Sequence, residues 1–219
     1  METGIQQTNV GTVHSGGKTI YKVGFWSALI ASVGACGYSV VQVLQVVGAI
    51  VRPWDGILIF GFSLLIATPF MLAMLALHYS TPTEKRFWSH AALLLTVVYV
   101  VYVTLNYVVQ LAVVIPALQP RASLDVLDQT PHSLCWTLDA LGYIFMGLAM
   151  LFAFPVFEKQ GLQNWLRWFF LANALMTPVI AIIYFYPTFS ITLLLIGLPW
   201  IITAPGSILL LTVFFRRKL

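Results

Sequence analysis

Six uninterrupted apolar runs, each longer than 20 residues, constrain what this chain of 219 residues can fold into. A hydrocarbon core of about 30 Å is crossed by about 20 residues of α-helix. Because lipid offers no partner to a backbone amide, such a run satisfies its own polar groups as a helix. The predicted spans cover residues 25–51, 56–77, 88–118, 134–157, 165–186 and 190–214. We therefore expect an all-α polytopic bundle of six transmembrane helices over residues 23–219, after a polar cytoplasmic tail at 1–22.

Composition excludes an ordinary water-soluble domain. Apolar residues make up 60% of the chain and charged residues 8%, whereas soluble domains have about 45–50% and about 25%. The net charge is +4, but the basic residues are scattered through short connections and form no single patch. A nucleic-acid partner is therefore not expected. The partner that the composition does predict is the lipid bilayer.

The positions of the basic residues predict the orientation. Cytoplasmic connections carry an excess of Lys and Arg. With the N-terminus inside, the outer connections hold only Arg52 and Arg121. The inner segments hold Lys18, Lys22, Lys85, Arg86, Lys159, Arg167, Arg216, Arg217 and Lys218. This asymmetry predicts that both termini are cytoplasmic (N-in/C-in). For a prokaryotic source it places the protein in the cytoplasmic, or inner, membrane.

A group of polar residues inside the predicted spans is the candidate functional site. Asp139 is the only carboxylate well inside a span, and polar groups at that depth face other helices or water. Residues three or four positions apart share a helix face, which relates Asp139 to Tyr143. The same spacing recurs in the third and first spans. The hypothesis is a polar cluster that opens outward, formed by Asp139, Tyr143, Asn106, Gln110, Tyr102, Gln42, Gln45 and Tyr38. The alternative is a set of interhelical hydrogen bonds that holds the bundle, each contributing about 0.6 kcal/mol.

Prolines within the spans suggest a second hypothesis. Thr68-Pro69 and Thr177-Pro178 lie at equivalent places in two three-helix halves, and Pro199 lies within the sixth span. Interrupted helices flank the central site of inverted-repeat transporters. These positions are therefore candidate helix breaks, and the two halves would superpose about an axis in the membrane plane. Proline is also common in membrane helices without this role.

The remaining motifs argue against bound metals and cofactors. Cys36 and Cys135 lie at different predicted depths, so we expect two free thiols and no disulfide. The chain has no Cys/His metal spacing and no nucleotide-binding or hydrolase motif. We expect no cofactor, no metal and no catalytic residue, which favours a non-enzymatic role.

Residues 138–175 resemble a pattern found in uncharacterised multipass proteins of bacteria and archaea. That pattern combines a GxxxxGLAxLF-like helix, a short inner loop and an entry to the next helix rich in Trp and Leu. Here its first part reads Gly142, Gly147, Leu148, Ala149, Leu151 and Phe152. The resemblance implies a six-helix membrane topology and carries no activity with it.

Three functions remain open on the sequence alone. The first is transport or permeation of a small solute through the outward-facing polar cluster. The second is a non-catalytic membrane subunit or scaffold that binds a protein partner. The third is a membrane enzyme that acts on a lipid, using Asp139 or the acidic outer loop.

Overall fold

The computed structural model describes residues 11–117, 126–188 and 190–219, and over these residues the chain is all-helical. A π-helical turn at Gln110–Val114 extends the third helix. Within the described residues, six segments are long and apolar enough to cross a membrane, which confirms that part of the predicted fold. The α-helices are α1 (Gly11–Val46), α2 (Trp54–Ser80), α3 (Arg86–Val109), α4 (Leu134–Ala153), α5 (Gly161–Phe185), α6 (Ile191–Ile196) and α7 (Trp200–Arg216).

Helix α1 begins earlier than expected. It starts at Gly11, inside the segment predicted to be a polar tail, and its membrane-capable part begins at Gly17. Near the end of the predicted tail, Ile20 and Tyr21 lie against the hydrophobic core, so tertiary packing stabilises the helix there. Residues 1–10 of the predicted tail and Arg121 of the predicted outer loop lie outside the described residues.

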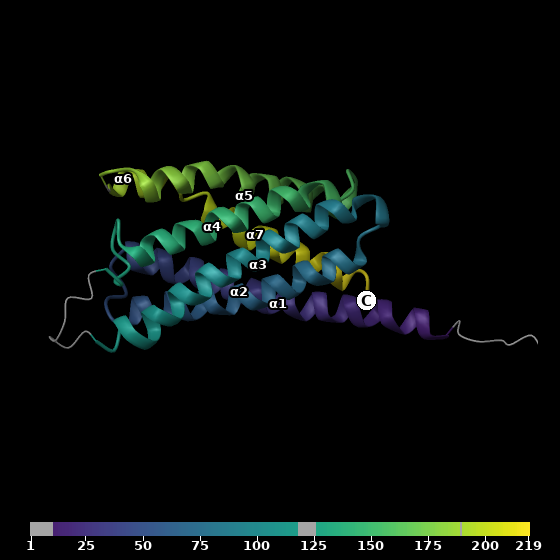
Figure 1. Cartoon of the computed structure of the whole chain (residues 1–219), viewed down its shortest axis with the longest axis horizontal. Coiled ribbons are helices and arrows are strands. Elements are labelled where there is room, and N and C mark those ends of the chain that lie inside the picture. Colours follow the sequence, from purple (N-terminus) through teal and green to yellow (C-terminus); the bar gives the residue numbers. More distant parts are fainter. Residues whose placement is uncertain (1–10, 118–125, 189) are drawn as a thin grey trace, which may run out of the picture.

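The six long helices form a closed ring. Each packs against the next one along the chain, from α1 through α5 to α7, and α7 packs back against α1. Helix α6 contacts α5. Successive long helices run in opposite directions, so the start of α1 and the end of α7 lie at the same end of the ring (Figure 1). We call this the terminal end, and the opposite end, where α1 ends and α2 begins, the cavity end.

This ring order contradicts the inverted-repeat hypothesis. A two-fold rotation about an axis perpendicular to the helices turns a group of helices end over end. Seen from one end of the bundle, the rotated helices then follow one another around the ring in the opposite direction. Superposing α1, α2 and α3 on α4, α5 and α7 preserves that direction, because the helices follow the chain order all the way round. The two halves are therefore not related by the predicted rotation.

The Thr-Pro pairs do not break their helices. Helix α2 is continuous through Thr68 and Pro69, and α5 is continuous through Thr177 and Pro178. Inside a helix bundle, neighbouring groups and small backbone adjustments accommodate the amide that proline lacks. The expected break at Pro199 is present. Helix α6 ends at Ile196, a turn follows, and Pro199 caps the start of α7.

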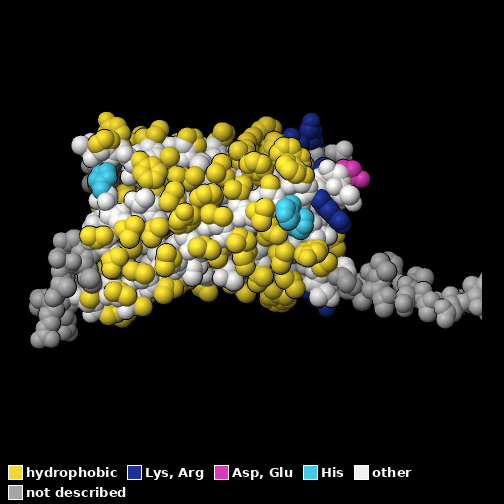
Figure 2. Space-filling model, in the orientation of Figure 1, with side chains coloured by type: hydrophobic (Ala, Val, Ile, Leu, Met, Phe, Trp, Pro, Cys, Tyr) yellow, Lys and Arg dark blue, Asp and Glu magenta, His cyan; other side chains and the backbone are white. Residues whose placement is uncertain are grey.

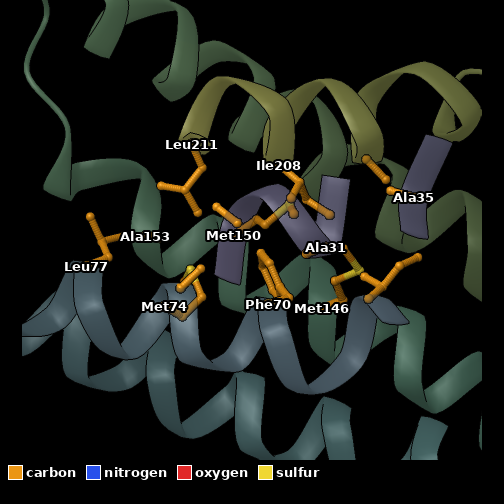
Figure 3. Packing of buried hydrophobic residues seen from close by; sticks show 14 of the residues in the cluster. Ala31, Ala35, Phe70, Met74, Leu77, Met146, Met150, Ala153, Ile208 and Leu211 are labelled. Carbon is orange, nitrogen blue, oxygen red and sulfur yellow. The ribbon is translucent and has the colours of Figure 1, made fainter. Parts of the chain in front are cut away.

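The core fills the centre of the ring and lies toward the terminal end. Phe70 and Met74 of α2 meet Met150 of α4 and Ile208 of α7, and all four side chains are at most 1% exposed (Figure 3). On the α1 side the contact surface is made of small residues, among them Ala31 and Ala35 (Figure 3). Small residues let two helix backbones approach closely. This half of the ring is therefore solidly packed.

The two ends of the bundle differ in the charged side chains on their surfaces. Hydrophobic side chains cover the length of the bundle, and on the face seen in Figure 2 Lys and Arg side chains gather near the terminal end. The cationic residues near this end belong to the start of α1, the α2–α3 and α4–α5 connections and the end of α7. A broad apolar band between two polar ends is the surface that a bilayer requires.

Candidate functional site

Asp139 lies near the start of α4 and is the centre of a hydrogen-bond network. Its side chain is 5% exposed and accepts four hydrogen bonds. Oδ1 accepts from the Tyr107 hydroxyl at 2.9 Å and from Asn106 Nδ2 at 3.4 Å. Oδ2 accepts from the Tyr184 hydroxyl at 2.8 Å and from Gln129 Nε2 at 3.0 Å. Both carboxylate oxygens are therefore satisfied by groups from α3, α5 and the segment before α4.

The network continues from α4 to the opposite side of the ring. The Tyr143 hydroxyl oxygen is 3.3 Å from that of Tyr107 and 3.3 Å from that of Tyr38 on α1. Tyr38 donates to Gln42 Oε1 at 2.9 Å, and Gln42 Nε2 donates to Gln45 Oε1 at 3.2 Å. A row of polar side chains thus runs from Asp139 along the face of α1 to its last turns.

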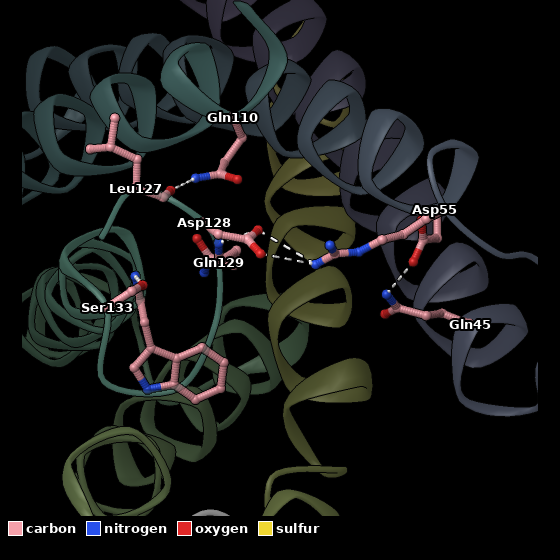
Figure 4. Close-up of polar contacts among 9 residues, drawn as sticks. Gln45, Asp55, Gln110, Leu127, Asp128, Gln129 and Ser133 are labelled. Atoms are coloured by element: carbon pink, nitrogen blue, oxygen red, sulfur yellow. Dashed lines mark hydrogen bonds and ion pairs between the residues drawn. The ribbon is translucent and has the colours of Figure 1, made fainter. Parts of the chain in front are cut away.

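The row ends at a second buried carboxylate, Asp55, in the first turn of α2. Gln45 Nε2 donates to Asp55 Oδ2 at 2.9 Å, whereas Oδ1 of Asp55 has no hydrogen-bond partner (Figure 4). The Asp55 side chain is 8% exposed. A buried carboxylate oxygen without a partner costs free energy, so Asp55 is a place where a bound group with a donor would be stabilising.

Both carboxylates line one cavity at the cavity end. Its volume is about 630 Å³, and it reaches the exposed α1–α2 connection at Val47 and Arg52. Arg52 forms an ion pair with Asp128 at 3.4 Å, which joins that connection to the segment before α4. Figure 4 shows Gln45 and Asp55 on one side of this region, with Gln110, Asp128 and Gln129 on the other.

A row of five aromatic side chains forms one wall of the cavity; we call it the aromatic wall. It consists of Trp136, Tyr184, Tyr143, Trp200 and Tyr38, with centroids of successive rings 4.4, 6.2, 5.0 and 5.4 Å apart. The Trp136 indole N–H also donates to the Tyr184 carbonyl oxygen at 3.0 Å. These contacts fix the rings against one another across α1, α4, α5 and α7.

The cavity is closed toward the terminal end. Tyr38, Tyr107, Tyr143 and Trp200 form its floor, because they also line a small void of about 10 Å³ beneath it. A void of that size holds about one water molecule. The packed core around Phe70 lies beyond it. Over the described residues, the cavity therefore has no opening toward the terminal end.

Most of the predicted cluster comes together here. Asp139, Tyr143, Gln110, Gln42, Gln45 and Tyr38 line the cavity. Asn106 is buried behind it, bonded to Asp139 and Gln129. Tyr102 lies elsewhere, because the inward face of α3 at that level carries Val103, and the Tyr102 ring stacks on Phe145 of α4 with centroids 5.7 Å apart.

Several cavity residues were not predicted: Asp55, Tyr107, Gln129, Tyr184 and Trp200. Asp55 falls one residue before the predicted start of the second span. Gln129 lies in a connection, where no periodicity indicates which side chains point inward. The loop is held over the cavity because Gln110 in the π-helical turn donates to the Leu127 carbonyl oxygen (Figure 4). For Trp200, the one indication in the sequence of a place beside a cavity is that Gly197–Pro199 interrupt the apolar run just before it.

The fold and the apolar helices indicate a multi-pass membrane protein with a polar pocket at one end. Comparisons with protein-family models, with curated proteins and with solved structures find no match to this chain.

Proposed function

We propose that this protein is a carrier for a small solute in the cytoplasmic membrane and that the cavity is its solute-binding site. The observation that carries the proposal is the cavity of about 630 Å³ with two buried carboxylates on its surface. Small-molecule sites have volumes of about 300–1,000 Å³ and combine apolar walls with a few polar groups. A scaffold subunit has no need of such a pocket, because its contacts lie on its outer surface.

The orientation proposed here has both termini in the cytoplasm, so the cavity opens to the outside. It is supported by the cationic residues near the terminal end and by the positive-inside rule. The closed floor supports a carrier rather than a channel, because the described residues below Tyr143 and Trp200 are packed and leave no continuous aqueous path. Solute passage then requires the helices to rearrange around the occupied site.

The test measures uptake by the full chain reconstituted in lipid vesicles. The vesicles are incubated in a defined mixture of cationic, neutral and anionic metabolites, and their contents are compared by mass spectrometry with those of protein-free vesicles. Gly56 lines the cavity, and a Cβ atom added there would lie 3.4 Å from Ile115, another lining residue, so we expect the bulk of Gly56→Trp to reduce the cavity's volume. Gly61, on the same helix, lines no part of the cavity, and a Cβ atom added there would have no neighbour within 4 Å.

We expect wild-type vesicles to accumulate particular solutes. Gly56→Trp lowers that uptake by about tenfold or more because the tryptophan occupies the solute's volume, and Gly61→Trp leaves it unchanged. Absence of uptake by the wild-type protein, or equal uptake by the wild-type and Gly56→Trp proteins, would contradict the proposal. A steady ionic current across a planar bilayer would show that the protein is a channel and not a carrier.

A further inference from the structure

We propose that the cavity binds a monovalent organic cation: a protonated amine whose nitrogen faces Asp55 and whose apolar or aromatic body packs on the aromatic wall. This inference rests on the proposed function and adds the charge and the chemical class of the solute. Three features of the cavity carry it, namely its charge balance, the unpaired oxygen of Asp55 and the row of aromatic rings.

The charge balance of the cavity is negative. Among the described residues that line it, three are carboxylates, Asp55, Asp128 and Asp139, and one, Arg52, is basic. Arg52 is already paired with Asp128 at 3.4 Å. Two carboxylates therefore remain in a largely apolar pocket. Burying charge without a counter-charge is costly, so a cation is the solute that this surface favours and an anion is disfavoured.

The two remaining carboxylates differ in their free acceptor capacity. Asp139 accepts four hydrogen bonds, which use both of its oxygens. Asp55 accepts one, at Oδ2, and its Oδ1 is unpaired. An ammonium group donates short, charge-assisted hydrogen bonds to a carboxylate. Oδ1 is itself buried, so Asp55 is the counter-ion that a bound amine would contact once the carboxylate turns toward the cavity, while Asp139 holds the surrounding network in place.

The aromatic wall favours an organic solute over an inorganic ion. Aromatic faces carry negative electrostatic potential and attract cations, and they also provide apolar surface for a hydrocarbon body. Metal ions instead require several oxygen ligands; Ca²⁺, for example, takes about 6–8. Within the described part of the chain no group of three or more His, Cys, Asp and Glu side chains is close enough to hold a metal. Gln45 moreover directs an N–H toward Asp55 and not an oxygen.

Three soluble probes of matched shape test the inference. Phenethylamine is cationic at neutral pH, 2-phenylethanol is its neutral analogue, and 3-phenylpropanoate is an anion with the same ring and spacer. Binding to the purified full chain in lipid nanodiscs is followed by calorimetry and by intrinsic tryptophan fluorescence, to which Trp136 and Trp200 in the cavity lining contribute. We expect phenethylamine to bind about tenfold or more tightly than 2-phenylethanol, and the anion to bind most weakly.

Asp55→Asn identifies the counter-ion, because it removes the charge and keeps the shape. We expect it to abolish the preference for phenethylamine while binding of 2-phenylethanol is retained. The control is Glu158→Gln, a matched loss of one carboxylate at an exposed site between α4 and α5.

Should Asp55→Asn fail to fold, Trp200→Phe and Trp200→Leu provide a second comparison. The ring-retaining variant then keeps phenethylamine affinity, and the ring-deleting variant loses it.

The outcomes separate this inference from the proposed function. Equal binding of the three probes, tighter binding of the neutral or anionic probe, or an unchanged preference in Asp55→Asn would overturn the organic-cation assignment. So would failure of phenethylamine to bind. None of these results affects the carrier proposal, which depends on solute uptake and its loss in Gly56→Trp.

Discussion

The Tyr184 hydroxyl donates a hydrogen bond to Asp139 Oδ2 over 2.8 Å and so joins the last turns of α5 to the buried face of α4. The same tyrosine ring lies 4.4 Å from Trp136, centroid to centroid. Tyr184 therefore belongs both to the hydrogen-bond network around Asp139 and to the aromatic wall of the cavity. This double role makes it the first position at which to test the network.

Tyr184→Phe removes the hydroxyl and keeps the ring. We expect the free energy of unfolding to fall by about 1.5–3 kcal/mol, the usual contribution of a hydrogen bond to a charged group. The measurement is denaturant or thermal unfolding in one detergent. Tyr102→Phe is the matched control, because Tyr102 lies outside the cavity and stacks on Phe145. Equal stability of the two variants would show that the bond to Asp139 is not formed.

The same substitution at the two buried carboxylates should give opposite results. Asp139→Asn replaces one carboxylate oxygen by an NH2 group. Because both oxygens accept hydrogen bonds in the wild type, this NH2 group faces a hydroxyl or amide donor whichever way the side chain is oriented. We expect a loss of about 1–3 kcal/mol. Asp55→Asn removes a charge whose Oδ1 has no partner, so its stability should equal or exceed that of the wild type. A larger loss at Asp55 than at Asp139 would contradict this assignment of the network.

The contact between α4 and α5 depends on Gly147. A Cβ atom at this position would overlap Thr177 Oγ1. We expect Gly147→Ala to lower the free energy of unfolding by about 1–3 kcal/mol, as overpacking does in cores, and Thr177→Ala to restore much of the loss in the double variant. Gly61→Ala is the control, since nothing lies within 4 Å there. Additive losses in the double variant would argue against this contact.

The number of membrane-capable helices was predictable because it depends on bulk properties. Runs of more than 20 apolar residues separated by prolines or charges set the six membrane-capable helices, and tertiary packing only shifted their ends. Packing of Ile20 and Tyr21 on the core stabilises α1 near the end of the predicted tail.

The cavity was only partly predictable, because side-chain direction depends on local geometry that spacing does not capture. Spacings of three and four residues predicted that Tyr102 and Asn106 share the inward face of α3. In the structure, Val103 and Tyr107 are the residues buried beside Asn106. Gln129 comes from a connection, and Asp55 from the first turn of α2. A carboxylate at the edge of an apolar run is easily taken for a solvated one. Inside the bundle its side chain accepts a hydrogen bond from Gln45, a contact that the sequence pattern does not indicate.

Sidedness is tested by cysteine labelling in intact cells. Both native cysteines are free, as predicted, so Cys36→Ser and Cys135→Ala provide a cysteine-free background. Thr188→Cys lies in the exposed α5–α6 connection at the cavity end, and Lys159→Cys lies in the exposed α4–α5 connection at the terminal end. A membrane-impermeant maleimide should label Thr188→Cys from outside and Lys159→Cys only after permeabilisation. The reverse pattern would invert the proposed orientation.

The most direct test of the account is the chemistry of a single cysteine inside the cavity. Gly56→Cys, in the same cysteine-free background, places a thiol on the cavity wall beside Asp55. Intact cells are treated with a trimethylammonium methanethiosulfonate reagent or with its sulfonate analogue, and each rate is divided by that for a free thiol in solution. An outward-open acidic cavity predicts rapid labelling from outside, with the cationic reagent favoured by about tenfold or more. No labelling, or an equal or greater rate for the anionic reagent, would contradict the central claim that this cavity admits cations from the outer side.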